Sequence, residues 1–147
     1  MAAQADLSEL PDAFVTGLNA LRQRDCHDAE VVLVEDNFAW ILLQPVDLEQ
    51  LGLPFKEKSC LLFARAPLTF PNADPYGIAT VPLLHRVDDA AIDRLHASHQ
   101  HITNLAKKPG YADIGFWSWE WKNMRKDMPE RLGDLFVWAL KRLREEK

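Results

Sequence analysis

The sequence has few cysteines, few glycines and no excess of positive charge. Only two of its 147 residues are cysteine, Cys26 and Cys60, and they form no C-x-x-C pair, so no disulfide framework is expected. The six glycines form no glycine-rich phosphate-binding loop. With 17 Lys and Arg against 22 Asp and Glu, the formal net charge is −5. This balance argues against nucleic acid as a partner, because binding to phosphates needs a basic surface.

Long hydrophobic runs are also missing. The apolar stretches are far shorter than the ~20 residues of a membrane-spanning helix. Residues 1–6 have neither the basic nor the apolar region of a signal peptide. We therefore expect a cytoplasmic protein with reduced thiols and no membrane association. Because 48% of the residues are hydrophobic, we expect one folded domain over residues 1–147 that needs no cofactor.

Hydrophobic periodicity predicts an α+β domain. Apolar residues at offsets of three and four indicate helices, and short β-branched runs bounded by turn formers indicate strands. We expect helices packed on one face of an antiparallel sheet of three or four strands. The expected elements are a helix over residues 6–24, a hairpin of strands 29–34 and 38–43, strands 60–64 and 78–84, a helix from about Asp88, and a C-terminal helix that starts near Pro129 with an apolar stripe over 132–143.

Three histidines, His96, His99 and His101, lie within six residues. If the segment bends suitably, their imidazoles could share a metal ion, with Cys60 or Glu120 completing the shell. The alternative is a polar helix end with solvated histidines, whose positive form suits the helix dipole. This second interpretation is favoured, because no C-x-x-C or H-E-x-x-H motif accompanies the cluster.

The two cysteines are candidates for a nucleophile. A reactive thiol needs a lowered pKa and partial exposure. Cys60 opens the most apolar predicted strand, and Cys26 follows the end of the first helix, where the dipole opposes a thiolate. Small buried thiols are therefore the favoured interpretation for both.

Trp117, Trp119 and Trp121 stand at alternate positions. On a strand all three would project to one side. On a loop they could fill the core or present an aromatic binding surface. We leave core and interface open, and expect Trp119 to be the most buried of the three.

A proline-rich segment follows the third predicted strand. It contains Phe70-Pro71 and Pro75-Tyr76, and Pro82 follows. With its surroundings it resembles the E2 ubiquitin-conjugating (UBC) superfamily, whose proline turn reads F-P-x-x-Y-P-x-x-P. The nearer likeness is to the divergent prokaryotic E2 family E, in which an L-P-x-x-Y-P-D-A-x-P-D segment is followed by a W-x-x-W-S-R-H segment and an amphipathic helix. Residues 70–76, 117–121 and 132–143 match these in order.

The resemblance implies a UBC/RWD-like fold and a place in a bacterial ubiquitin-like modification system. Its partners there would be a ubiquitin-like protein, an E1-like activating enzyme and a JAB-type peptidase. The two matching segments would supply the binding residues. These are Phe70, Pro71, Pro75, Tyr76, Trp117, Trp119 and Trp121.

The usual catalytic cysteine is missing. In ordinary E2 enzymes it follows the proline turn, after a His-Pro-Asn tripeptide, whereas residues 95–102 here contain no cysteine and His85-Arg86-Val87 is the nearest tripeptide. A thioester requires a thiol. We therefore expect a non-catalytic binding or scaffold variant. The alternatives are an active conjugating enzyme that uses Cys60 and a metal-binding protein that uses the histidine cluster.

Overall fold

Six strands form one antiparallel sheet in the order β1-β2-β3-β4-β6-β5. The structure is a computed structural model and describes residues 10–147, so residues 6–9 of the predicted first helix lie outside the described part. The α+β class is confirmed. The elements are α1 (Asp12–Arg24), β1 (Glu30–Glu35), β2 (Phe38–Asp47), β3 (Ser59–Pro67), β4 (Tyr76–Val81), β5 (Leu95–His96), the 3₁₀ helices η2 (Gln100–Ile102) and η3 (Leu105–Lys107), β6 (Gly115–Glu120), the 3₁₀ helix η4 (Pro129–Asp134) and α2 (Leu135–Arg144).

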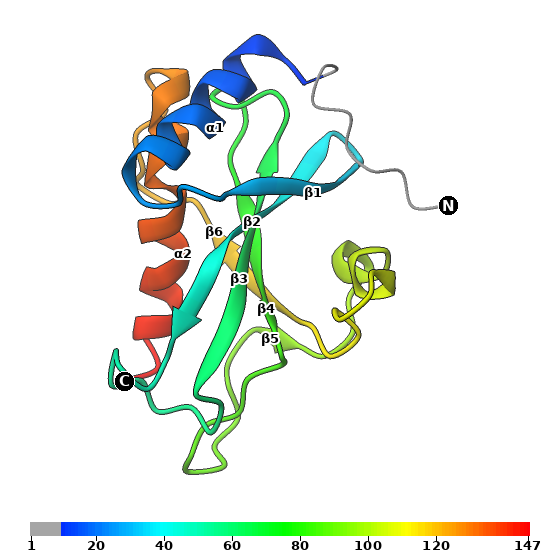
Figure 1. Ribbon diagram of the computed structural model, residues 1–147, viewed down its shortest axis with the longest axis vertical. Helices are drawn as coiled ribbons and strands as arrows, with labels where there is room; N and C mark the ends of the chain where they lie inside the picture. Colours follow the sequence, from blue (N-terminus) through cyan, green and yellow to red (C-terminus); the bar gives the residue numbers. More distant parts are fainter. Residues whose placement is uncertain (1–9) are drawn as a thin grey trace.

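The sheet separates two hydrophobic layers. On one face lie α1 and α2, so that the two helices share a side of the sheet as predicted, and the segment with η2 and η3 covers part of the other face (Figure 1). Phe14 and Leu18 of α1 belong to the larger core on the helix side. Phe63 and Phe116 belong to the smaller core on the other side. Alternation along each strand divides the side chains between these two cores.

The β1–β2 hairpin is confirmed and has a two-residue turn. Glu35 pairs with Phe38 across it, and Asp36 and Asn37 have φ values of 55° and 64°. A type I′ hairpin turn needs positive φ at both central residues, and Asp and Asn tolerate that conformation best after glycine. The local sequence therefore sets the register of these two strands.

The sheet is larger than the three or four strands predicted. β4 spans Tyr76–Val81 and ends directly before Pro82, three residues short of the predicted end at Leu84. β6 pairs with β4, and β5 pairs with β6. Residues 115–120, which contain Trp117 and Trp119, are therefore a strand of the sheet. Its pairing joins residues far apart along the chain, which local patterns do not reveal.

The predicted helix from Asp88 is wrong. The chain from Pro82 to Arg94 is irregular and leads into the two-residue strand β5. Asp89 and Arg94 both have φ of 62°, which an α-helix does not accommodate. The Asp88 carboxylate accepts the Ala90 N–H in a local turn rather than as a helix cap.

The C-terminal helix has the predicted apolar stripe but begins differently. Pro129 starts the 3₁₀ turn η4, and the α-helix begins only at Leu135. The turn packs tightly on α1, where a Cβ at Gly17 would lie 2.7 Å from Leu132 Cβ and 2.8 Å from the Pro129 carbonyl oxygen. The absence of a side chain at Gly17 is therefore what allows this close approach.

We expect Gly17→Ala to lower the free energy of unfolding by about 2 kcal/mol, because overpacking against backbone outweighs the gain in helix propensity. Gly133→Ala is the matched control, since its Cβ would meet only ordinary contacts with Ala20 at 3.5 Å and beyond. Urea denaturation of both variants measures the difference. If Gly17→Ala is as stable as the control, the close contact between α1 and η4 is not rigid.

Candidate functional site

Both thiols are buried. Cys60 lies near the start of β3 on the helix side of the sheet and is 4% exposed. Burial, with a smaller contribution from Glu57, raises the pKa of its thiol to about 12. Burial and the neighbouring Asp25 likewise raise the pKa of Cys26 to about 12. A nucleophilic cysteine needs access and a thiolate at neutral pH, and Cys60 has neither.

The residues that the resemblance implies for binding fall into two groups. One group is in the protein interior, and the other is half-exposed. The interior group is Phe70, Pro75, Trp117 and Trp121, and the half-exposed group is Pro71, Tyr76 and Trp119. The ring of Phe70 meets that of Trp121 edge-on, with centroids 6.0 Å apart, so the two matching segments pack against each other. Only the half-exposed group can touch a partner without rearrangement.

The prediction that Trp119 is the most buried tryptophan is wrong. All three side chains do belong to the helix-side core, Trp117 and Trp119 by alternation along β6 and Trp121 directly after the end of that strand. Trp117 pairs with Ile78 in β4, well inside the sheet, whereas Trp119 is one residue from the end of β6. The indole of Trp119 stacks on Trp138 of α2, and its Nε1 donates to the Trp138 carbonyl oxygen at 3.0 Å.

The structure brings the three histidines together around Phe116. The ring of His99 stacks on Phe116 with a centroid distance of 4.3 Å. The rings of His96 and His101 lie on either side of the His99 ring, with centroids 5.3 and 4.7 Å from it. His96 Nε2 lies 3.1 Å from Ser118 Oγ, and His99 Nδ1 accepts the His101 N–H at 3.1 Å.

This cluster does not form the metal centre that was the alternative interpretation. Within residues 10–147, no group of three His, Cys, Asp or Glu side chains is placed to hold a metal ion. Cys60, which with Glu120 was one of two candidates for a further ligand, lies in the helix-side core, and Phe116 belongs to the core on the other face. The rings share an aromatic neighbour rather than a common point for their nitrogen atoms.

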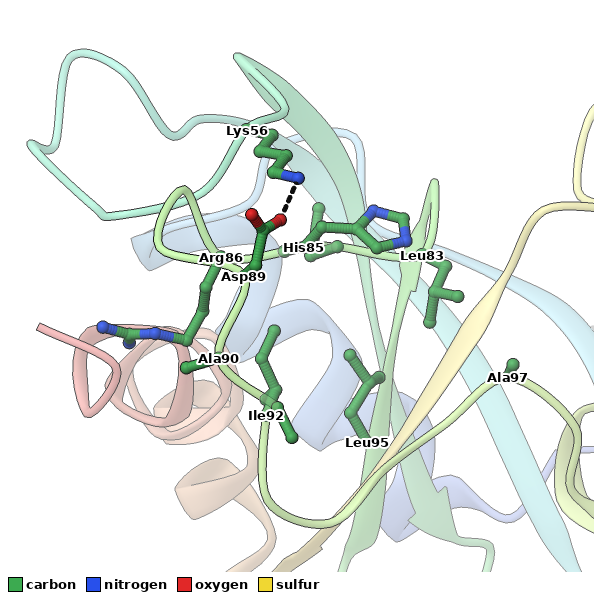
Figure 2. A pocket seen from close by; sticks show the side chains of 11 residues that line it. Lys56, Leu83, His85, Arg86, Asp89, Ala90, Ile92, Leu95 and Ala97 are labelled. Carbon is green, nitrogen blue, oxygen red and sulfur yellow. Dashed lines mark hydrogen bonds and ion pairs between the residues drawn. The ribbon is translucent and has the colours of Figure 1, made fainter.

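A cavity of about 350 Å³ lies where the chain leaves β4 (Figure 2). Sequence reasoning did not find it, because its walls come from the loop before β3 and from the segment predicted as a helix. Leu83, Ile92 and Leu95 provide apolar side chains. The complete lining is Lys56, Leu83, Leu84, His85, Arg86, Asp89, Ala90, Ala91, Ile92, Leu95 and Ala97.

The two loops that form the cavity are tied together. Lys56 N–H donates to the His85 carbonyl oxygen at 2.8 Å, and the Lys56 ammonium pairs with Asp89 above the cavity. Arg86 extends away from the cavity toward the end of α2 (Figure 2), where its guanidinium binds the Glu146 carbonyl oxygen and the Asp88 carboxylate. Its charge is therefore already neutralised by neighbours.

His85 at the cavity rim is held by Glu57. One carboxylate oxygen accepts the His85 backbone N–H, and the other lies 2.8 Å from Nδ1. Burial acts to raise the pKa of Glu57, but the hydrogen bonds from His85 outweigh it and leave the pKa lowered. An ionised carboxylate can only accept hydrogen bonds, so Nδ1 is the donor in this contact. Of the residues 10–147 that line the cavity, none has a hydroxyl or thiol.

Comparison with protein-family models, curated proteins and solved structures finds no match to this chain. Within the described part of the chain, no helix is long and apolar enough to cross a lipid bilayer.

Proposed function

We propose that the protein is a non-catalytic E2-like domain of a bacterial ubiquitin-like modification system, where it binds the ubiquitin-like protein or the E1-like activating enzyme. The observation that carries the non-catalytic role is the burial of both cysteines, each with a pKa of about 12. A protein that cannot present a thiolate cannot hold the thioester of a conjugating enzyme. Its contribution to such a system is then recognition.

The order of elements supports the E2-like part of the proposal. α1 leads into four consecutive strands, β1 to β4, each antiparallel to the one before. The proline-rich segment connects β3 to β4, and Pro82 directly follows β4. The pair β5 and β6 is an addition to the pattern that the resemblance implies.

The cavity supports a binding role at the end of β4. In ordinary E2 enzymes the catalytic cysteine lies in the segment after the proline turn. Here the window of that cysteine, residues 95–102, contributes Leu95 and Ala97 to the cavity, and the segment before it contributes Leu83 and Ile92. Ligand sites are mostly apolar concave surfaces with a few polar groups that fix orientation, and His85 at the rim is such a group. We propose that an extended segment of the partner occupies this cavity.

A combined thioester and binding assay tests the function. The chain is incubated with the E1-like enzyme and ubiquitin-like protein of the same system and ATP, beside Cys60→Ala and Cys26→Ala variants. We expect no reductant-sensitive adduct on non-reducing gels, but saturable binding to one of the two partners by calorimetry. An adduct lost in Cys60→Ala would show an active enzyme with a displaced thiol. The absence of both adduct and binding would overturn the proposal.

Substitutions at Ala90 and at the nearby Val87 test whether the partner binds at the cavity. Ala90 is exposed and lines the cavity, whereas Val87 is 59% exposed and does not. We expect Ala90→Glu to weaken partner binding by about tenfold, because a charged side chain would then occupy a contact that the partner desolvates. We expect Val87→Glu to leave binding unchanged, because Val87 does not line the cavity. Equal effects would place the contact elsewhere.

A further inference from the structure

Arg65 is a buried cation without a polar partner. It lies on β3, on the face covered by η2 and η3, and is 5% exposed. Its guanidinium stacks over the ring of Phe38 at 3.8 Å. Within residues 10–147 it makes no hydrogen bond or ion pair, and Asp36 and Glu35 act on it only through space.

A comparison with Arg142 shows how unusual this is. Arg142 is also buried, but its guanidinium donates to the Glu146 carboxylate and to the Asp93 carbonyl oxygen. Buried charges in proteins are normally paired and hydrogen-bonded, because an unpaired one forfeits its hydration without compensation. Arg65 has five N–H donors and stacking on Phe38 satisfies none of them. Its donors are therefore available to an external acceptor.

Three side chains on the same face of the sheet as Arg65 can also donate hydrogen bonds. Arg65 pairs with Trp40 of β2, and Trp40 Nε1 donates to the His101 carbonyl oxygen at 2.9 Å, which places His101 and the adjacent His99 ring near Arg65. The guanidinium also contributes to lowering the pKa values of both histidines, after burial as the main cause. Tyr76 lies beside them, with its ring centroid 6.4 Å from that of His101. All three side chains are half-exposed, so a small molecule can reach them from solvent.

The ring of Phe116 lies beneath His99 and His101 and is held in place by close packing on β4. A Cβ at Gly77 would lie 2.5 Å from the ring of Phe116, so the absence of a side chain there lets the ring lie on the backbone of β4. Phe116 in turn supports the rings of His99 and His101. The donors are therefore held by packing on Phe116, together with the hydrogen bond from the His101 N–H to His99 Nδ1.

We propose that Arg65, with His99, His101 and Tyr76, forms a binding site for a phosphate group. A phosphate has enough acceptor oxygens to use an arginine fork and further donors together, and charge close to −2 near neutral pH. A single carboxylate has two oxygens and one charge, and it would leave part of this donor set unused. The site is on the opposite face of the sheet from α1 and α2 and is independent of the proposed E2-like function.

Negative charges near the site set a limit on its affinity. Asp36 and Glu35, at the β1–β2 turn, contribute to the field at both Arg65 and His101. Glu35 is held by Asn104, whose Nδ2 donates to Oε2 at 2.6 Å. His96 adds positive charge next to His99 when protonated. A bound phosphate is therefore expected to raise the pKa values of both imidazoles, because it stabilises their protonated forms.

The test uses the full chain, with inorganic phosphate and AMP as probes of free phosphate and of a phosphate ester. Calorimetry measures affinity, and histidine NMR signals report the location. We expect saturable binding that shifts the signals of His99 and His101 and makes both rings gain protons at higher pH, while exposed His27, beyond α1, is unchanged. Tighter binding of AMP identifies an ester as the ligand, and equal binding identifies free phosphate; both support the site.

Arg65→Met keeps the apolar stem and removes the charge, and Arg94→Met is the control because Arg94 is exposed. We expect the first to weaken binding by about ten- to one-hundredfold and the second to leave it unchanged, as charge-assisted hydrogen bonds contribute about 1.5–3 kcal/mol. No saturation with either probe, or equal affinity in the two variants, would overturn the proposal. If Arg65→Met does not fold, the histidine signals of the unaltered chain decide: shifts at His99 and His101 support the site, and shifts elsewhere refute it.

Discussion

Replacing Trp117 with alanine is expected to lower the free energy of unfolding by about 3–5 kcal/mol. The side chain has no exposed surface and lies on β6 in the helix-side core. Its ring meets Phe55 edge-on at 6.3 Å, and Nε1 donates to Thr80 Oγ1 at 3.0 Å. Truncation leaves a large cavity and also removes the partner of a buried hydroxyl, which adds to the cost.

Trp119→Ala is the matched control for this experiment. Trp119 is two residues away on the same strand and faces the same side, but it is half-exposed and packs mainly on Trp138. We expect it to cost about 1–2 kcal/mol, because less apolar surface is lost and solvent can fill the gap. Urea denaturation of both variants gives the comparison. A larger loss for Trp119→Ala would mean that Trp119, rather than Trp117, is the core residue of the segment.

Local patterns in the sequence were sufficient to predict the β1–β2 hairpin and the two α-helices. The alternation of apolar runs around Asp36 and Asn37 identified the hairpin, because a two-residue turn of this type needs residues that tolerate positive φ. The apolar offsets in α1 and in α2 identified both helices, because each buries one face. These features depend on neighbours within a few residues.

Long-range contacts explain what could not be predicted. Ile92 and Leu95 have helical spacing, but Arg142 of α2 donates to the Asp93 carbonyl oxygen between them, in a backbone where Arg94 has positive φ. β6 is a strand because it pairs with β4, which no local pattern shows. Tertiary contacts thus override the helical spacing here.

The candidate sites also combine features that local spacing predicts with features that depend on distant residues. The proximity of His96, His99 and His101 followed from their spacing, whereas the direction of their nitrogen atoms depends on Phe116, in another strand. The pair of Glu57 and His85 joins residues 28 positions apart, so no local sequence motif predicts it. In the sequence, this segment is marked only by the charged run Lys56-Glu57-Lys58, which precedes the candidate thiol Cys60.

Arg142→Met is expected to lower the free energy of unfolding by about 3 kcal/mol, because it removes a buried charge-assisted hydrogen bond to Glu146 and the bond to the Asp93 carbonyl oxygen, while Glu146 keeps its ion pair with Arg86. Nη1 donates to Glu146 Oε2 at 2.8 Å, and Nη2 donates to the Asp93 carbonyl oxygen at 2.7 Å. The guanidinium also lies over the ring of Trp117, 5.0 Å from its centroid. One side chain thus joins α2, β6 and the segment that lines the cavity.

The same substitution should loosen the wall of the cavity. Without the bond to Asp93, the neighbouring residues Ile92 and Leu95 lose an anchor to α2, and hydrogen exchange of their amides should become faster. Arg144→Met is the control, because Arg144 is exposed on the same helix and its loss should change stability by less than about 0.5 kcal/mol. Equal exchange and stability in the two variants would show that α2 does not hold this segment. A selective loss in Arg142→Met would show that the end of α2 maintains the shape of the cavity, through a contact made entirely outside its lining.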